Sequence, residues 1–171
     1  MKLILLQRDV GLINRLMPLI TIVICVVASL IPAHLPALTA VTPAFPLMAV
    51  YHWTLYRPDL LPFVAVFAAG LLLDMLTGAP LGISSLVLLL AYALVLSQRE
   101  LLLMRRFTVV WIGFLVVTAS AAALQWVVVS LFYGTLLDAR AFLFQAVLTA
   151  AVYPVVSYLL VRVQRALLMR A

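Results

Sequence analysis

The feature that most constrains this chain is a long uncharged run near its N-terminus. Residues 16–56 carry no formal charge, and the run is about twice as long as the ~20-residue helix that crosses a bilayer. Hydrophobic residues make up 68% of the chain and charged residues 9%, against about 45–50% and about 25% in soluble domains. The sequence therefore predicts an integral membrane protein, with residues 1–171 forming a single membrane domain.

Six apolar segments are predicted to form transmembrane helices of a compact all-α bundle, joined by short connections. They are 16–33, 38–56, 60–76, 81–98, 107–133 and 142–161. Residues 1–15 are expected to form a cytoplasmic or interfacial N-terminus, and residues 162–171 a basic cytoplasmic tail. Pro154 should kink the sixth helix near its middle, because proline interrupts the helical hydrogen bonds.

Basic residues are distributed unevenly between the two ends of the predicted bundle. Successive connections between the predicted helices lie on opposite sides of the membrane. Ten of the 11 Lys and Arg residues lie on one side, and Arg140 alone lies on the other. This asymmetry predicts that both termini are cytoplasmic. Orientation and attraction to anionic lipids thus explain the net charge of +6 without nucleic-acid binding. Tyr51, Trp53 and Tyr56, next to Arg57, are expected to belong to an aromatic belt at the cytoplasmic interface.

One carboxyl group lies within an apolar segment. Asp74 is the only charged residue between Asp59 and Arg99, and the turn sequence TGAPLG follows it closely. A carboxylate at membrane depth costs about 2.5–3.5 kcal/mol on insertion scales, so its position needs an explanation. Asp side chains accept hydrogen bonds from backbone N–H groups in a following turn, which favours a structural cap. A direct interaction with a neighbouring helix or a partner protein is one alternative, and proton or ion handling is another.

The sequence Arg57-Pro58-Asp59 joins the second and third predicted helices. Proline biases Arg57 away from helical conformation, and Asp59 can cap the helix that follows. We therefore interpret this sequence as the closure of a helical hairpin. A contact with a cytoplasmic partner is the alternative.

Polar residues recur at every fourth position of the sixth segment: Gln145, Thr149, Tyr153 and Ser157. Residues with this spacing share one helix face, so we expect this polar stripe to point into the bundle or at a partner. Interhelical packing is the favoured interpretation. Small residues at 118–123, followed by Gln125, are likewise expected to allow close packing of the fifth helix.

Residue patterns typical of catalysis or metal binding are missing from the sequence. Cys25 is the only cysteine, and His34 and His52 are expected near opposite membrane surfaces. A phosphate-binding glycine loop and a nucleophile–base motif are both absent. We therefore predict a protein that is not an enzyme and that uses no cofactor or metal.

The stretch 51–82, YHWTLYRPDLLPFVAVFAAGLLLDMLTGAPLG, resembles the MreD family of bacterial rod shape-determining proteins. The shared features are an Arg-Pro turn, a helix that ends in Gly-Leu-Leu-Leu-Asp, and a Gly-x-Pro-Leu-Gly turn. The residues that carry them, with Asp59 and Thr77 between them, are Arg57, Pro58, Gly70, Asp74, Gly78, Pro80 and Gly82. The chain length, six spans and cytoplasmic termini also fit.

The resemblance implies a non-enzymatic scaffold in the bacterial inner membrane that supports lateral peptidoglycan synthesis. Its implied partner is MreC, and MreB filaments and the RodA polymerase with its transpeptidase form the wider complex. Members of the family also resemble, in fold, the substrate-binding membrane subunits of energy-coupling-factor transporters. This likeness is one of fold and carries no function with it. A separate alternative function is a small-molecule-binding subunit of a transporter, in which Asp74 or the polar stripe lines an outward-facing cavity.

Overall fold

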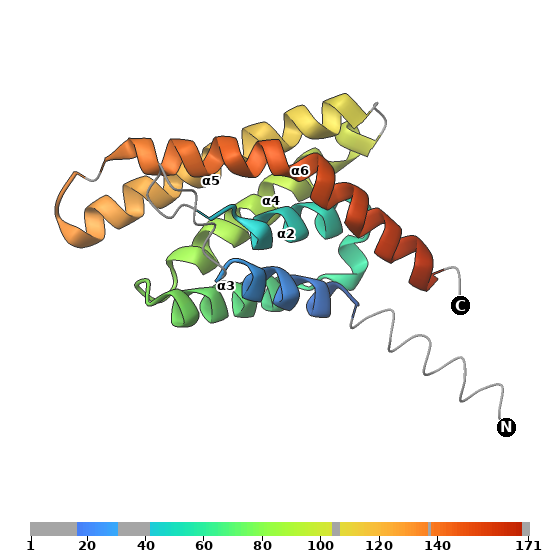
Figure 1. The fold of residues 1–171 in the computed structure, drawn as a ribbon, viewed down its shortest axis with the longest axis horizontal. Coiled ribbons are helices and arrows are strands. Elements are labelled where there is room, and N and C mark those ends of the chain that lie inside the picture. Colours follow the sequence, from blue (N-terminus) through green and yellow to red (C-terminus); the bar gives the residue numbers. More distant parts are fainter. Residues whose placement is uncertain (1–16, 31–41, 104–106, 137, 169–171) are drawn as a thin grey trace, which may run out of the picture.

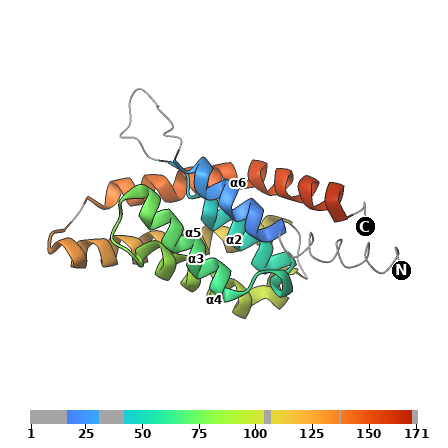
Figure 2. The ribbon, with the colours of Figure 1, turned by 90° about the horizontal axis from the view of Figure 1, so that it is seen from below.

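The computed structural model describes residues 17–30, 42–103, 107–136 and 138–168. Within these residues all regular secondary structure is helical, without strands (Figures 1 and 2). The elements are the N-terminal helix Met17–Ala28, α2 (Phe45–Tyr56), the 3₁₀ helix η1 (Pro58–Leu60), α3 (Phe63–Thr77), α4 (Ile83–Leu103), α5 (Phe107–Tyr133) and α6 (Ala139–Leu168). The structure does not describe the predicted interfacial segment 1–15 or His34. It also does not describe the side chains of most of the basic tail.

Among the described helices, α4, α5 and α6 are long and apolar enough to cross a membrane. They contain 21, 27 and 30 residues, whereas a bilayer requires about 20. The N-terminal helix, α2 and α3 are shorter, with 12 residues in α2 and 15 in α3. The described residues therefore contain six α-helices, of which three have the length of a full span, and the crossing of the membrane by the three shorter helices stays a prediction.

Proline and glycine account for the short helices. Proline at the start of α2 leaves residues 42–44 outside the helix, so the predicted span 38–56 begins late. Pro62 precedes α3, and Gly78 ends it in a left-handed conformation. Both residue types favour such boundaries, because proline lacks a backbone N–H group and glycine tolerates positive φ.

The α2 helix lies in the middle of the bundle, and residues 46–55 are all buried. It packs against α4 and α6, and the Trp53 indole N–H donates a 2.7 Å hydrogen bond to Thr21 Oγ1 of the N-terminal helix. The exposed fractions of Tyr51 and Trp53 are 0% and 2%. The expectation of an aromatic belt was therefore wrong for these two residues, whose polar groups find partners inside the bundle.

An aromatic cluster joins α2, α5 and α6. The rings of Phe114 and Tyr153 stack with centroids 3.9 Å apart, and Tyr51 meets both edge-on. The Tyr51 hydroxyl donates a 2.8 Å hydrogen bond to the carbonyl oxygen of Val110. Edge-on and offset arrangements are the favourable geometries for aromatic pairs, so this cluster fixes how the three helices meet.

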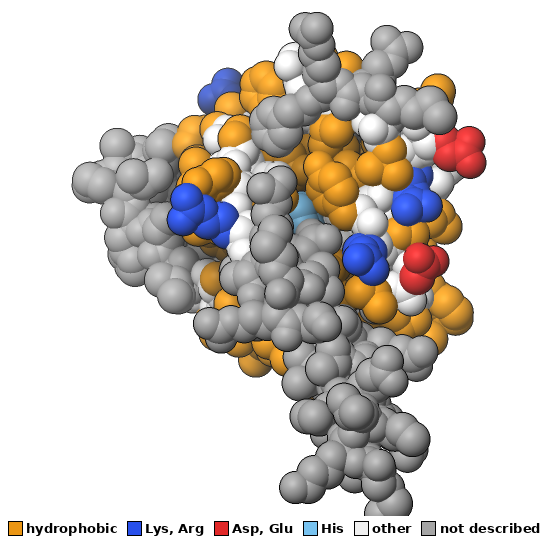
Figure 3. All heavy atoms as spheres, turned by 90° about the vertical axis from the view of Figure 1, so that its right-hand side faces the viewer, with side chains coloured by type: hydrophobic (Ala, Val, Ile, Leu, Met, Phe, Trp, Pro, Cys, Tyr) orange, Lys and Arg blue, Asp and Glu red, His pale blue; other side chains and the backbone are white. Residues whose placement is uncertain are grey.

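The bundle has two chemically different ends. The start of the N-terminal helix and the end of α6 lie at the same, right-hand end in Figure 1. We call this the basic end, because Arg57, Arg99 and Arg162 stand at or near the ends of α2, α4 and α6 that lie there. Figure 3 views this end, where basic and acidic side chains surround hydrophobic ones. The opposite end, which holds the α3–α4 turn and the start of α6, is called the turn end.

The longest helix, α6, contains Pro154 within its length. Figure 1 shows α6 changing direction between its orange-red and dark-red parts. This bend agrees with the predicted kink, since a proline inside a helix removes a hydrogen bond and displaces the preceding turn.

Candidate functional site

The carboxyl group of Asp74 is fully buried and lies between α3 and α4. Its Oδ2 accepts a hydrogen bond from the backbone N–H of Gly82 at 2.7 Å, and its Oδ1 accepts one from the N–H of Ser84 at 3.1 Å. These donors stand at the start of α4, where backbone N–H groups have no partner within the helix. Asp74 thus occupies the last turn of α3 and caps the first turn of α4, which is the geometry expected of a structural cap.

Two glycines give the α3–α4 turn its backbone path. Gly78 has φ 69° and ψ 17°, and its N–H bonds to the carbonyl oxygen of Asp74, as does the N–H of Ala79. Gly82 has φ 99°, a conformation that side chains with a Cβ rarely adopt. The Thr77 hydroxyl donates back to the carbonyl oxygen of Leu73 at 2.8 Å. The turn is therefore fixed by its own backbone as well as by Asp74.

Gly70 lies where α3 and α4 approach most closely. A Cβ atom added there would lie 2.5 Å from the backbone nitrogen of Ser85 and closer still to its Cα. The Ser85 hydroxyl reaches across the same contact and donates a 3.0 Å hydrogen bond to the carbonyl oxygen of Phe67. Small residues allow such backbone approach between helices. Gly70, Asp74, Gly78 and Gly82 together shape one helical hairpin.

The Arg57-Pro58-Asp59 sequence lies at the other end of α3, at the basic end. The backbone N–H of Arg57 ends α2 through a 2.8 Å bond to Trp53, and Pro58 begins η1. Asp59 is an exposed residue within η1, and the N-cap of α3 is Pro62, without a side-chain hydrogen bond. The expectation that Asp59 caps the next helix was therefore wrong, because η1 and two further residues separate it from α3.

The polar stripe of α6 faces the bundle interior. Thr149, Tyr153 and Ser157 are buried, and Gln145 is half-buried. The Thr149 hydroxyl accepts a 3.0 Å hydrogen bond from the N–H of Ala44 and donates one to the carbonyl oxygen of Gln145. Ala44 is the N-cap residue of α2 and supplies no side-chain cap of its own. Thr149 thus satisfies an N-terminal donor of the buried α2.

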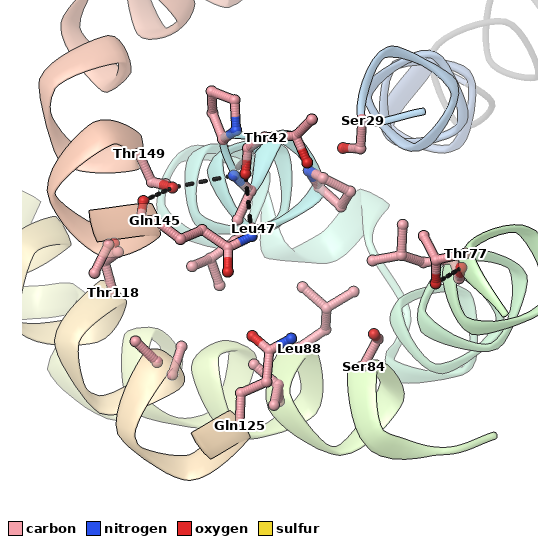
Figure 4. A pocket seen from close by; sticks show the side chains of 18 of the residues that line it. Ser29, Thr42, Leu47, Thr77, Ser84, Leu88, Thr118, Gln125, Gln145 and Thr149 are labelled. Atoms are coloured by element: carbon pink, nitrogen blue, oxygen red, sulfur yellow. Dashed lines mark hydrogen bonds between the residues drawn. The ribbon is translucent and has the colours of Figure 1, made fainter. Parts of the chain in front are cut away.

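A cavity of about 290 Å³ lies at the turn end. It is lined by polar residues (Ser29, Thr42, Thr77, Ser84, Thr118, Gln125, Gln145, Thr149) and by Pro43, Ala44, Pro46, Leu47, Leu73, Ala79, Val87, Leu88, Ala121, Ala122 and Ala146. Figure 4 shows Gln125 of α5 and Gln145 of α6 pointing into the same space. The Gln145 Nε2 atom donates a 3.1 Å hydrogen bond to the carbonyl oxygen of Thr42.

The cavity brings together predicted residues that the sequence did not connect. Thr77 of the turn and Gln145 and Thr149 of the stripe all line it, whereas Asp74 is not among its lining residues. Sequence reasoning assigned residues 118–123 to packing and missed that Thr118 and Gln125 face this space. The available signal was the presence of Thr118 at the start of the run of small residues and of Gln125 just after it.

Metal coordination finds no support in the described part of the chain. No group of three or more His, Cys, Asp or Glu side chains lies close enough there to hold an ion. Asp59, Glu100 and Asp138 are exposed, and only Asp74 places a carboxyl group inside the described bundle.

Comparison with known proteins gives one match. The family model described as rod shape-determining protein MreD matches residues 11–169, nearly the whole chain. No curated protein and no solved structure matches at a significant level.

Proposed function

Because the chain belongs to the MreD family of rod shape-determining proteins, we propose that it is a scaffold of the complex that elongates the bacterial cell wall. The observation that carries this proposal is the family match over residues 11–169. The family is one of shape-determining structural components, which gives the chain a role in rod shape determination. As a scaffold it would support lateral peptidoglycan synthesis by holding other proteins together.

The proposed direct partner is MreC. MreB filaments and the RodA polymerase with its transpeptidase would belong to the wider complex, and membrane lipids would cover the apolar helix surfaces. Large hydrophobic side chains on those surfaces support lipid contact, for example Val147 and Val155, which are 67% and 62% exposed. Side chains of this kind facing outward are expected where the surrounding solvent is lipid.

We propose that residues 1–171 form one domain in the inner membrane, with both termini in the cytoplasm. The uneven distribution of Lys and Arg supports this orientation. It would make the basic end cytoplasmic and would place the turn end on the outer side. Arg57, Pro58 and Asp59 would then be available to a cytoplasmic partner.

For MreC we propose a contact at the turn end, on the outer surface of the α3–α4 turn. Leu81, at the tip of this turn, is 69% exposed, and Met75, on the last turn of α3, is 72% exposed. Asp74 is buried beneath them and would act by holding the turn in shape rather than by touching the partner. Gly70, Thr77, Gly78, Pro80 and Gly82 would serve the same structural purpose.

Controlled depletion tests the proposed function. A rod-shaped bacterium that depends on this chain should lose its rod shape and become round as the protein is depleted, and a plasmid copy should restore rods. Rods of normal width after complete depletion would refute the proposal.

A second candidate function is favoured by one observation, the polar cavity at the turn end. A small-molecule-binding subunit of a transporter needs a cavity of this kind, and Gln145 and Thr149 line it. On this alternative, depletion would abolish uptake of one nutrient and leave cell shape intact. Cell shape and nutrient uptake in the same depleted culture therefore separate the two candidates.

A further inference from the structure

The cavity at the turn end has both apolar and uncharged polar residues in its lining. Its lining consists of Ser, Thr, Gln, Pro, Ala, Leu and Val residues, so no described lining residue carries a charge. A charged molecule would lose its hydration there without gaining a charged partner, which is strongly unfavourable. No aromatic ring is present among these lining residues either, so stacking cannot select an occupant. Hydrogen bonding and size are the remaining selective features.

Several hydrogen-bonding groups that face the cavity are unused. The Thr118 side chain is 3% exposed, and its Oγ1 has no hydrogen-bond partner among the described residues. The Gln125 amide points into the cavity and makes no hydrogen bond to the residues drawn in Figure 4. Gln145 donates through Nε2 to Thr42, which leaves its Oε1 as an acceptor. Buried polar groups are normally paired, so these groups call for a partner.

We propose that this cavity binds a small uncharged molecule whose amide or hydroxyl groups hydrogen-bond to Gln125 and Gln145. Each glutamine amide group can both donate and accept hydrogen bonds, which matches neutral amides and polyols. The cavity volume of about 290 Å³ lies at the lower limit of ligand sites, about 300–1,000 Å³. The occupant is therefore smaller than a typical drug molecule.

A molecule bound in the cavity would stabilise the whole turn end. Each described α-helix contributes a lining residue, either from the helix itself or from the residue directly beside it. Ser29 follows the N-terminal helix, Ala44 precedes α2, and α3, α4, α5 and α6 supply the remaining walls. A ligand that binds only the folded state stabilises it by mass action. This inference does not depend on partner binding, so its failure would leave the proposed scaffold function untouched.

Ligand-observed saturation-transfer NMR on the full chain in lipid nanodiscs tests the proposal. The probes are malonamide and glycerol, and malonate serves as the charged counterpart of malonamide. We expect signal transfer to malonamide or glycerol and none to malonate. Gln125→Leu should abolish the transfer by removing the amide, and Ala122→Leu should abolish it by filling the cavity.

Ala151→Leu provides the matched control, because Ala151 is exposed on α6 and does not line the cavity. This variant should retain the full signal, and equal unfolding temperatures would show that all three variants are folded. Two variants with different mechanisms keep the test valid if one of them fails to fold. The proposal is overturned if neither neutral probe receives saturation, if malonate receives as much, or if transfer persists in both cavity variants.

Discussion

Asp74 Oδ2 accepts a 2.7 Å hydrogen bond from the backbone N–H of Gly82, eight residues further along the chain. This bond joins the last turn of α3 to the residue that precedes α4. The second oxygen of the same carboxyl group accepts a hydrogen bond from the N–H of Ser84, so one side chain holds two backbone N–H groups at the start of α4. The explanation for a carboxyl group in an apolar helix is therefore local, and it lies in the start of the next helix.

Replacing Asp74 with Ala should lower the free energy of unfolding by about 2–4 kcal/mol, because two partly buried N–H groups lose their acceptor. Asp74→Asn retains one good acceptor and should have a smaller effect. Unfolding in detergent and abundance in the membrane measure both changes. Asp59→Ala is the control, because this exposed carboxyl group caps no helix. Equal stability of Asp74→Ala and the unmodified chain would show that Asp74 is not a structural cap.

Gly70→Ala should force α3 and α4 apart, because the new methyl group would overlap the backbone of Ser85. Overpacking of this kind costs about 1–3 kcal/mol or more. Gly113→Ala is a control on another helix, where the new Cβ would meet side-chain atoms, the flexible end of Leu102 and, at 3.0 Å, the Tyr51 hydroxyl, rather than backbone. Thermal unfolding should therefore show a clearly larger loss for Gly70→Ala. A larger loss for Gly113→Ala would contradict the close approach of α3 and α4.

Gly82→Ala should destabilise the turn through its backbone rather than through a clash. No atom lies within 4 Å of the added Cβ, but φ is 99°. A left-handed conformation costs a residue with a Cβ about 1–2 kcal/mol. Gly78→Asn should be milder, because Asn tolerates the αL region that Gly78 occupies. Circular-dichroism melting curves would rank the two variants, and the reverse order would argue against this backbone path.

Thr149→Val should destabilise the fold by about 1–2 kcal/mol, because the partly buried N–H of Ala44 would lose its acceptor without a change in side-chain shape. Thr54→Val is the control, since the Thr54 hydroxyl bonds only to the carbonyl oxygen of Val50 in its own helix. Urea unfolding of both variants provides the measurement. Equal effects would mean that Thr149 does not hold the start of α2.

Membrane character, the three long helices and the α3–α4 turn could be predicted from the sequence. Charge-free segments and the Gly and Pro residues around Asp74 are local signals, and they require no knowledge of packing. The burial of Tyr51 and Trp53 could not be predicted, because lipid and protein interior are equally apolar and both accept aromatic side chains. Hydrophobic pattern alone therefore does not distinguish a central helix such as α2 from a lipid-facing one.

The cavity was equally inaccessible to sequence reasoning. Small residues at 118–123 allow helices to approach closely, but they also leave space where the neighbouring helix does not approach. Whether small residues produce a close contact or a cavity depends on how α5 crosses α2, α4 and α6. The length of α2 affects this crossing. Because the start of α2 was predicted too early in the chain, the surroundings of Gln125 could not be anticipated.

The amount of MreC that co-purifies with this chain from membranes is the most direct test of the scaffold and its proposed contact at the α3–α4 turn. We predict that MreC is recovered with the unmodified protein and with Leu136→Asp, which alters a residue that is 87% exposed after α5 at the same end. Leu81→Asp, at the tip of the α3–α4 turn, should reach normal membrane abundance and lose most of the MreC. Absence of MreC from the unmodified protein at normal abundance would contradict the scaffold, and full recovery with Leu81→Asp would contradict the proposed contact.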